Sequence, residues 1–216
     1  LKINQGMMLE SQIEEVLEYQ TKSNNDILVG TPREITDKVV LTDNHVKILT
    51  GIRRCGKSTA LLQIARKFPH YNYLSFEDPR LSTFVVNDFF KLEKIFERIG
   101  KSDLFFFDEI QNVEGWERYV RVLQDKKQKV IVTGSNANML SKELGTALTG
   151  RQISLEVYPF SYTEYLTHLN QSAGIESFSG YFQLGGMPEF LNTNNRDVLL
   201  NLYNDLIYRD IVVRHG

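Results

Sequence analysis

The stretch VKILTGIRRCGKSTALLQIARKF, residues 46–68, decides the fold of this chain. It begins with apolar and β-branched residues, which predict a buried strand at 46–50. It ends with apolar residues at helical spacing, which predict a helix at 57–68. Between the two, residues 51–58 fit the pattern G-x-x-x-x-G-K-[ST]. A glycine-rich loop between a strand and a helix is the context that a phosphate-binding loop requires.

The residue types of this loop predict the groups that hold a nucleotide. Backbone N–H groups and the helix N-terminus bind phosphates. Lys57 is expected to reach the β- and γ-phosphates as a catalytic residue, Ser58 to bind Mg²⁺ and Thr59 to contact the α-phosphate. The alternative is a chance glycine-rich turn, which the strand and helix on either side disfavour. The predicted ATP-binding residues are Gly51, Ile52, Arg53, Arg54, Cys55, Gly56, Lys57, Ser58 and Thr59.

A second motif lies about fifty residues further on. Residues 104–109 read LFFFDE, an apolar strand that ends in two acids. This is the form of a Walker B element, in which Asp108 holds Mg²⁺ through water and Glu109 polarises the attacking water. An acidic pair after a strand is more often a solvated loop. Its place after a phosphate-binding loop, on the third predicted strand, favours the catalytic interpretation.

Short strands alternate with helices over the middle of the chain. Further strands are expected at 71–76, 103–107, 129–133 and 152–157, and further helices at 86–99, 116–123 and 137–144. Apolar strands that alternate with helices predict an α/β fold with a parallel sheet covered on both faces.

Three regions are predicted from the change in pattern. Residues 1–30 form an N-terminal helical appendage, with a helix at 7–19 and a polar stretch after it. Residues 31–158 form the ATPase core. Residues 159–216 form a helical lid, and we expect it to be the start of a longer C-terminal region. In this lid Ser161 and Glu164 suit a capping box, GG at 185–186 and Pro188 break the chain, and a long helix follows from about residue 197 to 213.

Seven motifs together resemble a large group of prokaryotic AAA-like P-loop ATPases that carry a C-terminal domain of uncertain function. They are GIRRCGKS (51–58), FEDPRL (76–81), FDEIQ (107–111), TGSN (133–136), LTGR (148–151), PFS (159–161) and GGMPE (185–189). The resemblance covers residues 30–216. It implies an AAA-type three-layer core with the five-stranded sheet order 5-1-4-3-2, and it implies that this chain lacks the C-terminal domain.

The resemblance also implies roles for residues outside the two Walker motifs. Ser135 and Asn136 are candidates for sensor 1, and we assign Asn136 as catalytic; capping of the next helix explains the same residue types. Arg151 stands where an arginine finger is often found, and an ion pair with a carboxylate at the sheet edge is its alternative. Pro188 is predicted to pack on adenine, although an ordinary turn between helices explains it as well.

The same sheet order places the second strand beside the third. Glu77 and Asp78 are therefore expected beside Asp108 and Glu109, where a carboxylate could orient the catalytic acid. Capping of a short helix by Asp78, ahead of Pro79, is the equally supported alternative.

Composition and charge set few limits on partners. The chain has 216 residues, of which 42% are hydrophobic and 24% charged, and its net charge is −2. That balance does not indicate nucleic acid as a partner, although a small basic patch is compatible with it. The single cysteine, Cys55, excludes an intrachain disulfide and fits a reducing cytoplasm. No run of about 18 apolar residues occurs, so no membrane span is predicted.

The motifs predict Mg²⁺-dependent ATP binding and hydrolysis that drives conformational change in attached domains or partners. The alternative is a slow nucleotide-dependent switch or scaffold with little turnover. A third class, a small-molecule P-loop kinase, is disfavoured by TGSN at 133–136 and by the helical tail. A homo-oligomer and a protein partner or substrate both stay open, because the sequence identifies neither.

Overall fold

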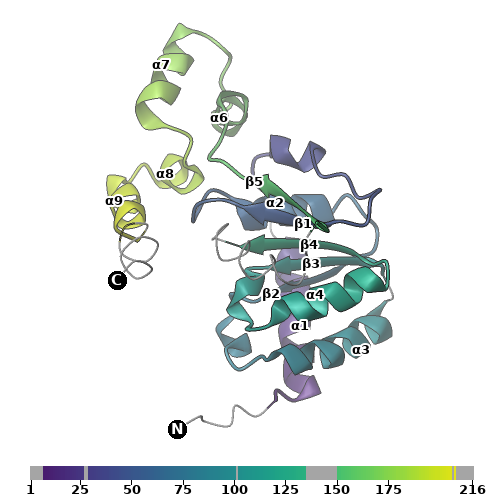
Figure 1. Cartoon of the computed structure of the whole chain (residues 1–216). Coiled ribbons are helices and arrows are strands. Elements are labelled where there is room, and N and C mark those ends of the chain that lie inside the picture. Colours follow the sequence, from purple (N-terminus) through teal and green to yellow (C-terminus); the bar gives the residue numbers. More distant parts are fainter. Residues whose placement is uncertain (1–6, 27–28, 101, 135–149, 206, 208–216) are drawn as a thin grey trace. The chain divides into compact units, whose positions relative to one another are not determined.

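The computed structural model describes residues 7–26, 29–100, 102–134, 150–205 and 207 (Figure 1). The chain divides into two compact units. The first contains residues 1–51 and 57–156, and the second contains residues 52–56 and 157–216. The boundaries predicted at residues 30 and 158 stay predictions, and the two units are described separately.

A five-stranded sheet lies at the centre of the first unit, and every neighbouring pair of strands is parallel. The strand order is β2-β3-β4-β1-β5, which is the predicted order 5-1-4-3-2 counted from the other edge. This confirms the predicted α/β class and AAA-type topology. The strands are β1 (Val46–Thr50), β2 (Asn72–Ser75), β3 (Leu104–Asp108), β4 (Lys129–Gly134) and β5 (Gln152–Glu156).

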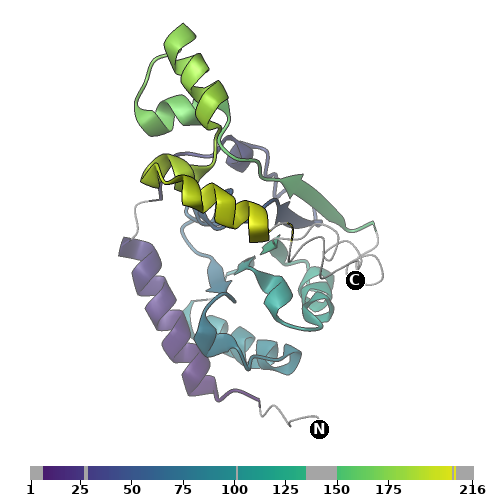
Figure 2. The same cartoon turned by 90° about the vertical axis from the view of Figure 1, so that its left-hand side faces the viewer.

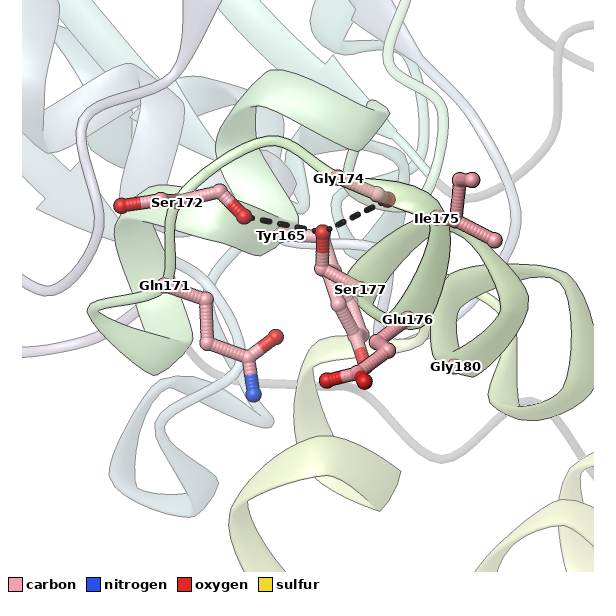
Figure 3. A pocket seen from close by; sticks show the side chains of 8 residues that line it. All are labelled: Tyr165, Gln171, Ser172, Gly174, Ile175, Glu176, Ser177 and Gly180. Carbon is pink, nitrogen blue, oxygen red and sulfur yellow. Dashed lines mark hydrogen bonds between the residues drawn. The ribbon is translucent and has the colours of Figure 1, made fainter.

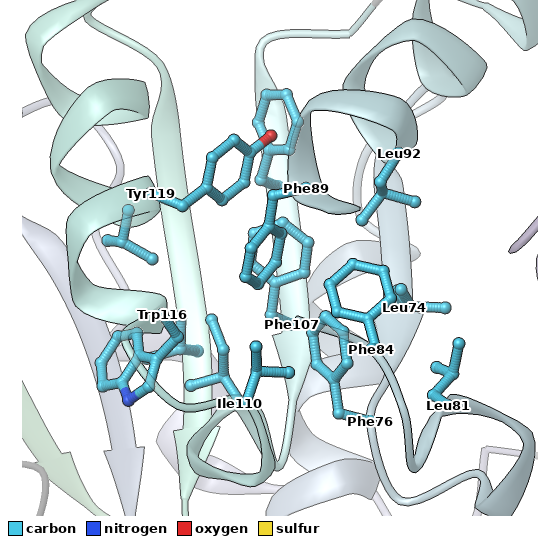
Figure 4. Packing of buried hydrophobic residues seen from close by; sticks show 14 of the residues in the cluster. Leu74, Phe76, Leu81, Phe84, Phe89, Leu92, Phe107, Ile110, Trp116 and Tyr119 are labelled. Carbon is cyan, nitrogen blue, oxygen red and sulfur yellow. The ribbon is translucent and has the colours of Figure 1, made fainter. Parts of the chain in front are cut away.

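Alternation along the central strands explains the layers on the two faces of the sheet. Ile48, Phe107 and Val132 belong to one continuous core cluster, which Phe89 of α3 (Phe89–Ile99) and Tyr119 of α4 (Trp116–Asp125) also enter. Phe89 stacks on Tyr119 with ring centroids 4.3 Å apart, beside Phe107 (Figure 4). The intervening strand residues point to the opposite face, and α2 (Lys57–Ala65) packs against β1, β3 and β4 there. Burial on both faces is why these strands read as continuous apolar runs.

The helices of the first unit confirm most sequence predictions within a few residues. They are α1 (Glu10–Asp26), α2 (Lys57–Ala65), α3 (Phe89–Ile99) and α4 (Trp116–Asp125), together with the short 3₁₀ turns η1 (Glu34–Asp37), η2 (Pro79–Leu81), η3 (Val86–Asp88) and η4 (Ile110–Asn112). The predicted helix at 137–144 lies outside the described residues.

Helix α1 corrects the prediction of a polar stretch after residue 19, because residues 21–26 continue the helix. Ile13, Val16 and Leu17 of α1 are buried in the core cluster. The Gln20 side chain donates to the Ser75 carbonyl at 3.0 Å and accepts from the Ser75 N–H at 2.8 Å. A helix thus supplies the partners that the edge strand β2 lacks, which is one way to protect a sheet edge. Polar residues can continue α1 because one side of it stays exposed.

The described part of the second unit is helical after Val157. Its helices are α6 (Tyr162–Leu169), α7 (Ile175–Leu184), α8 (Pro188–Thr193) and α9 (Arg196–Asp205). α6 contacts α7, and α8 contacts α9 (Figure 2). The predicted capping box is confirmed, because Ser161 Oγ accepts from the Glu164 N–H and Glu164 Oε2 accepts from the Ser161 N–H. α8 was not predicted. Pro188 begins this helix rather than only breaking the chain, since proline suits a first helical position.

Candidate nucleotide site

The loop between β1 and α2 has the backbone of an anion-binding loop. Gly51, Arg54 and Gly56 have φ values of 148°, 63° and 97°. Positive φ values between ordinary residues curl a chain so that successive N–H groups point into one concavity. Arg54 adopts the left-handed region although it carries a side chain, which is uncommon for residues other than glycine.

Lys57 begins α2, and its ammonium group lies among the groups of both Walker motifs. The residue is 4% exposed. Its Nζ donates to the Gly51 carbonyl at 3.2 Å and lies 3.8 Å from Glu109 Oε1. A buried ammonium beside the loop backbone is a cation placed to meet phosphate oxygens.

Asp108 ends β3 and accepts hydrogen bonds from three hydroxyl groups. Ser58 Oγ and Thr133 Oγ1 donate to its Oδ1 at 3.0 and 2.5 Å, and Ser75 Oγ donates to its Oδ2 at 3.3 Å. Burial raises the pKa of Asp108 above its ordinary value. The bonds from Thr133 and Ser58 oppose that rise, and the negative charge of Glu109 adds to it. The fold therefore keeps this ionisable carboxylate away from solvent.

The oxygen donors at this point suit Mg²⁺. A serine hydroxyl and an aspartate carboxylate in direct contact are hard ligands of the kind that this ion prefers. Within the described residues no group of three or more His, Cys, Asp or Glu side chains could hold a metal. Mg²⁺ beside a nucleotide needs fewer protein ligands, because it keeps several waters and takes substrate phosphates. Ser58 and Asp108, both predicted from sequence, fit the ion.

Glu109 follows Asp108 in the left-handed region, with φ 50° and ψ 45°. Its N–H donates to Thr133 Oγ1 at 2.8 Å, and its carboxylate accepts from Gln111 Nε2 and faces Lys57. The structure therefore brings together the four predicted residues Lys57, Ser58, Asp108 and Glu109.

Sequence reasoning missed three side chains that contact the acids, namely Ser75, Thr133 and Gln111. The register of β2 and β3 pairs Ser75 with Asp108. The register of β3 and β4 pairs Phe107 with Val132 and so places Thr133 beside Asp108. Both are hydroxyl residues at the carboxyl ends of strands, where ligand groups gather in parallel sheets.

Two interpretations were open for the predicted pair Glu77 and Asp78: capping of a short helix, or a position beside Asp108 and Glu109. Asp78 caps η2, because its Oδ1 accepts from the Arg80 N–H at 3.0 Å. The Arg80 guanidinium also donates to this carboxylate at 3.0 and 2.7 Å and holds the pKa of Asp78 at about 2. Glu77 is close enough to Asp108 for its charge to raise the pKa of that residue. Asp78 therefore has the capping role.

The structure gives different information on three further predicted residues, namely Arg151, Thr59 and Asn136. The Arg151 guanidinium lies 3.1 Å from Asp125 Oδ1, and both side chains are about half exposed. Thr59 lies in the first turn of α2. Asn136 and its alternative Ser135 lie outside the described residues.

In the second unit, the predicted adenine contact belongs to a tight turn. Pro188 is the first residue of α8. A Cβ on Gly186 would lie 2.2 Å from the Phe160 carbonyl oxygen, while the Phe160 N–H donates to the Gly186 carbonyl at 2.7 Å. Backbone contact therefore requires glycine at 186. Glu189, next to Pro188, lies 3.0 Å from Arg54 of the phosphate-binding loop.

A separate cavity of about 660 Å³ lies between α6 and α7 (Figure 3). Glu176 is the one charged residue in its lining as the structure describes it, so the cavity offers no cation for a phosphate group. The residues predicted from sequence lie elsewhere. The lining of the cavity consists of Tyr165, Gln171, Ser172, Gly174, Ile175, Glu176, Ser177 and Gly180.

The parallel sheet order, the phosphate-binding loop and the two acids at the end of β3 define a P-loop nucleoside triphosphatase domain of the AAA class. Comparison with protein families agrees with this. Residues 43–166 match the family described as AAA domain, and the chain belongs to that family.

Curated relatives are about twice as long as this chain. A protein of Methanocaldococcus jannaschii described as uncharacterized is 30% identical over an aligned length of 234 residues. The alignment covers 99% of this chain and 51% of that protein. An uncharacterized protein of Haemophilus influenzae is 32% identical over 194 residues, with 80% and 48% covered. The chain thus spans about half the length of the curated relatives that it matches.

Solved structures that match part of this chain include AMPPCP-bound DnaA from Aquifex aeolicus. That match has a TM-score of 0.47 and 13% identity, and it covers 84% of this chain and 64% of that one. A DNA replication initiation factor matches with a TM-score of 0.45 and 14% identity, and the match covers 91% of this chain and 64% of that one.

Among the described helices of this chain, none has the length and apolar composition needed to cross a bilayer.

Proposed function

We propose that this domain binds ATP with Mg²⁺ and hydrolyses it, and that the nucleotide cycle drives conformational change in attached domains or partners. The contact between Ser58 Oγ and Asp108 Oδ1, 3.0 Å long, carries the proposal. It joins the phosphate-binding loop to the Walker B strand at the point where Mg²⁺ is bound in proteins with these motifs. We further propose that the protein acts in the cytoplasm.

Each residue of the site has a distinct task in this proposal. The loop N–H groups of residues 51–56 and Lys57 bind the phosphates, and Thr59 contacts the α-phosphate. Ser58 and Asp108 hold Mg²⁺, which would neutralise charge that develops on the phosphates. Glu109 orients and polarises the attacking water. Asn136 is proposed to contact the γ-phosphate or that water, and Pro188 to pack on adenine.

Coupling to conformation is supported by the ion pair between Arg54 and Glu189. Arg54 belongs to the phosphate-binding loop and Glu189 to the first turn of α8, and 3.0 Å separates their charged atoms. Phosphate groups attract a guanidinium more strongly than one exposed carboxylate does, because they offer more charge and more acceptor oxygens. Nucleotide binding is therefore expected to compete for Arg54. Helices α6–α9, proposed as a lid, would respond through α8.

Thermal unfolding tests nucleotide binding. A ligand bound only to the folded state adds RT ln(1 + [L]/Kd), about 2.7 kcal/mol at a hundredfold excess over Kd. Mg·ATP should therefore raise Tm, and Lys57→Ala should remove most of the shift. Lys67→Ala is the matched control, since Lys67 follows the other end of α2 and pairs with exposed Asp37. If Mg·ATP raises the Tm of Lys57→Ala as much as that of the parent, the proposed nucleotide site is contradicted.

Release of phosphate tests hydrolysis. Glu109→Gln keeps the shape of the side chain but cannot polarise water, so turnover should fall about 10²–10⁴-fold while the Tm shift persists. A slow switch is the second candidate, and the bond from Gln111 to the Glu109 carboxylate favours it because it occupies the proposed base. Parental turnover near background together with a large Tm shift would select the switch.

A further inference from the structure

One buried hydroxyl group contacts both acids of the Walker B motif. Thr133 Oγ1 donates to Asp108 Oδ1 at 2.5 Å and accepts from the Glu109 N–H at 2.8 Å. Thr133 is fully buried and Asp108 is 3% exposed. A backbone N–H can only donate, so the single proton of the hydroxyl is left for the carboxylate. Both bonds therefore have a defined direction.

The bond to the Glu109 N–H fixes a backbone that is otherwise unfavourable. Glu109 lies in the left-handed region, with φ 50°, and such a conformation persists where surrounding contacts hold it. The same residue directly precedes η4, and its carboxylate faces Lys57 and Gln111. The direction of the Glu109 side chain thus depends on a peptide group that Thr133 holds.

The hydrogen bond from Thr133 to Asp108 orients the other acid of the Walker B motif. Oδ1 is the oxygen that also accepts from Ser58, so the hydroxyl groups of Thr133 and Ser58 share it. The pairing of Phe107 with Val132 sets this geometry, because it places Thr133 beside Asp108 at the ends of neighbouring strands. Thr133 lies in β4, a central strand of the sheet, so its position is rigid.

We propose that Thr133 is a positioning residue that aligns the Mg²⁺ ligand Asp108 and the base Glu109 at the same time. The inference rests on the proposed function and deepens it. Thr133 acts through the two acids, since its hydroxyl group is already bonded to both. Groups that orient metal ligands typically change metal affinity or activity 10–100-fold when they are removed.

Thr133→Val is the test, because valine keeps the shape of threonine and lacks the hydroxyl group. We expect kcat for ATP to fall about 10–100-fold, KM for ATP to change less, and the Mg²⁺ concentration for half-maximal effect to rise. Thr133→Ser should restore kcat to within a few-fold of the parent. Thr133→Ala, checked for a folded Tm, replaces the valine variant if that variant does not fold.

Thr36→Val is the matched control. Thr36 is also a buried threonine, and its hydroxyl group contacts Lys67 and Asp37 rather than the acids of the site. It should leave kcat and the Mg²⁺ dependence unchanged. A kcat within twofold of the parent in Thr133→Val, or equal losses in the serine and valine variants, would overturn the positioning role.

A second measurement separates this inference from the proposed function. The Tm shift caused by ATP is titrated with Mg²⁺, which needs no turnover. If the parent binds Mg·ATP without hydrolysing it, the inference still requires a higher Mg²⁺ midpoint in Thr133→Val than in Thr133→Ser, and equal midpoints overturn it. If Mg·ATP leaves the parental Tm unchanged, the proposed site fails, and the inference fails with it.

Discussion

Asp108, a proposed Mg²⁺ ligand, is the last residue of β3. Its carboxylate is buried, and burial raises its pKa because the charged form loses hydration. Within the part of the chain that the structure describes, no cation lies within ion-pair distance of it; its partners are the hydroxyl groups of Ser58, Ser75 and Thr133. The proposed Mg²⁺ site thus leaves a charge that the folded protein compensates only in part.

Asp108→Asn should therefore raise Tm in the absence of nucleotide and Mg²⁺. The pKa of Asp108 is raised in the folded state, so the folded protein binds more protons than the unfolded chain as pH rises above the ordinary pKa of aspartate. Parental stability falls over that range, whereas the asparagine variant has no such charge. The gain in Tm should be largest at pH 7–8 and shrink toward pH 4, as measured by thermal scans across this range.

The same variant should lose the Mg²⁺ dependence of ATP binding, because an amide lacks the charge of a metal-binding carboxylate. Asp125→Asn is the control, since Asp125 is an exposed residue at the end of α4 that pairs with Arg151 and not with the groups around Asp108. A gain in Tm that does not vary with pH would contradict an origin in the buried charge.

Single elements differ in how far the sequence predicts them. β1, α2 and β3 were predicted because the phosphate-binding loop and the acidic strand end allow few alternatives in residue type and spacing. The contacts of Thr133 with Asp108 and Glu109 depend on the register of β3 and β4, which are separated by a helix in the chain. Local pattern carries no direct information about that register.

The elements η2 and α1 show the same limit. Asp78 suits both a cap and a catalytic neighbour, and the Arg80 side chain decides for the cap. The sequence predicts that this helix ends at residue 19 because a polar stretch follows, whereas α1 continues to Asp26. Gln20 pairs with the backbone of Ser75, 55 residues away, so this helix depends on a tertiary contact.

Gly186→Ala tests the turn before α8. Its Cβ would lie 2.2 Å from the Phe160 carbonyl oxygen, so the backbone must shift and the bond between Phe160 and Gly186 weakens. We expect a loss of about 1–3 kcal/mol, as for overpacked sites, and faster amide hydrogen exchange in residues 157–205. Gly174→Ala is the control, because a Cβ there meets nothing within 4 Å and the backbone is extended. Equal effects of the two variants would contradict the role of the contact.

For the whole molecule, the open question is whether the domain acts alone. The curated relatives are about twice as long as this chain. The proposed lid, and the homo-oligomer and protein partner that the sequence leaves open, all concern how the domain connects to other parts. Arg151 bears on this question. Its pair with Asp125 is exposed on both sides, and such surface pairs contribute about 0–1 kcal/mol. The guanidinium is therefore available for a stronger acceptor.

Arg151 is predicted either to act as an arginine finger on a neighbouring subunit or to stabilise its own sheet edge. An arginine finger contributes about 10³–10⁵ in rate where it acts, because it stays charged and can bind two phosphate oxygens. In the first case Arg151→Ala should lose turnover by a large factor and Asp125→Ala should not. In the second case both variants should keep parental turnover and lose a similar small amount of stability.

Concentration and mixing decide between these two roles. If Arg151 acts between subunits, specific activity should rise with protein concentration. Arg151→Ala should then regain activity when mixed with Glu109→Gln, since one chain supplies the arginine and the other supplies the base. Mixing cannot help if the arginine acts within its own chain, because each variant lacks one group of the same site. Loss of activity without rescue, at a rate independent of concentration, would place the arginine within one chain, and parental turnover in Arg151→Ala would leave it a structural residue of the sheet edge.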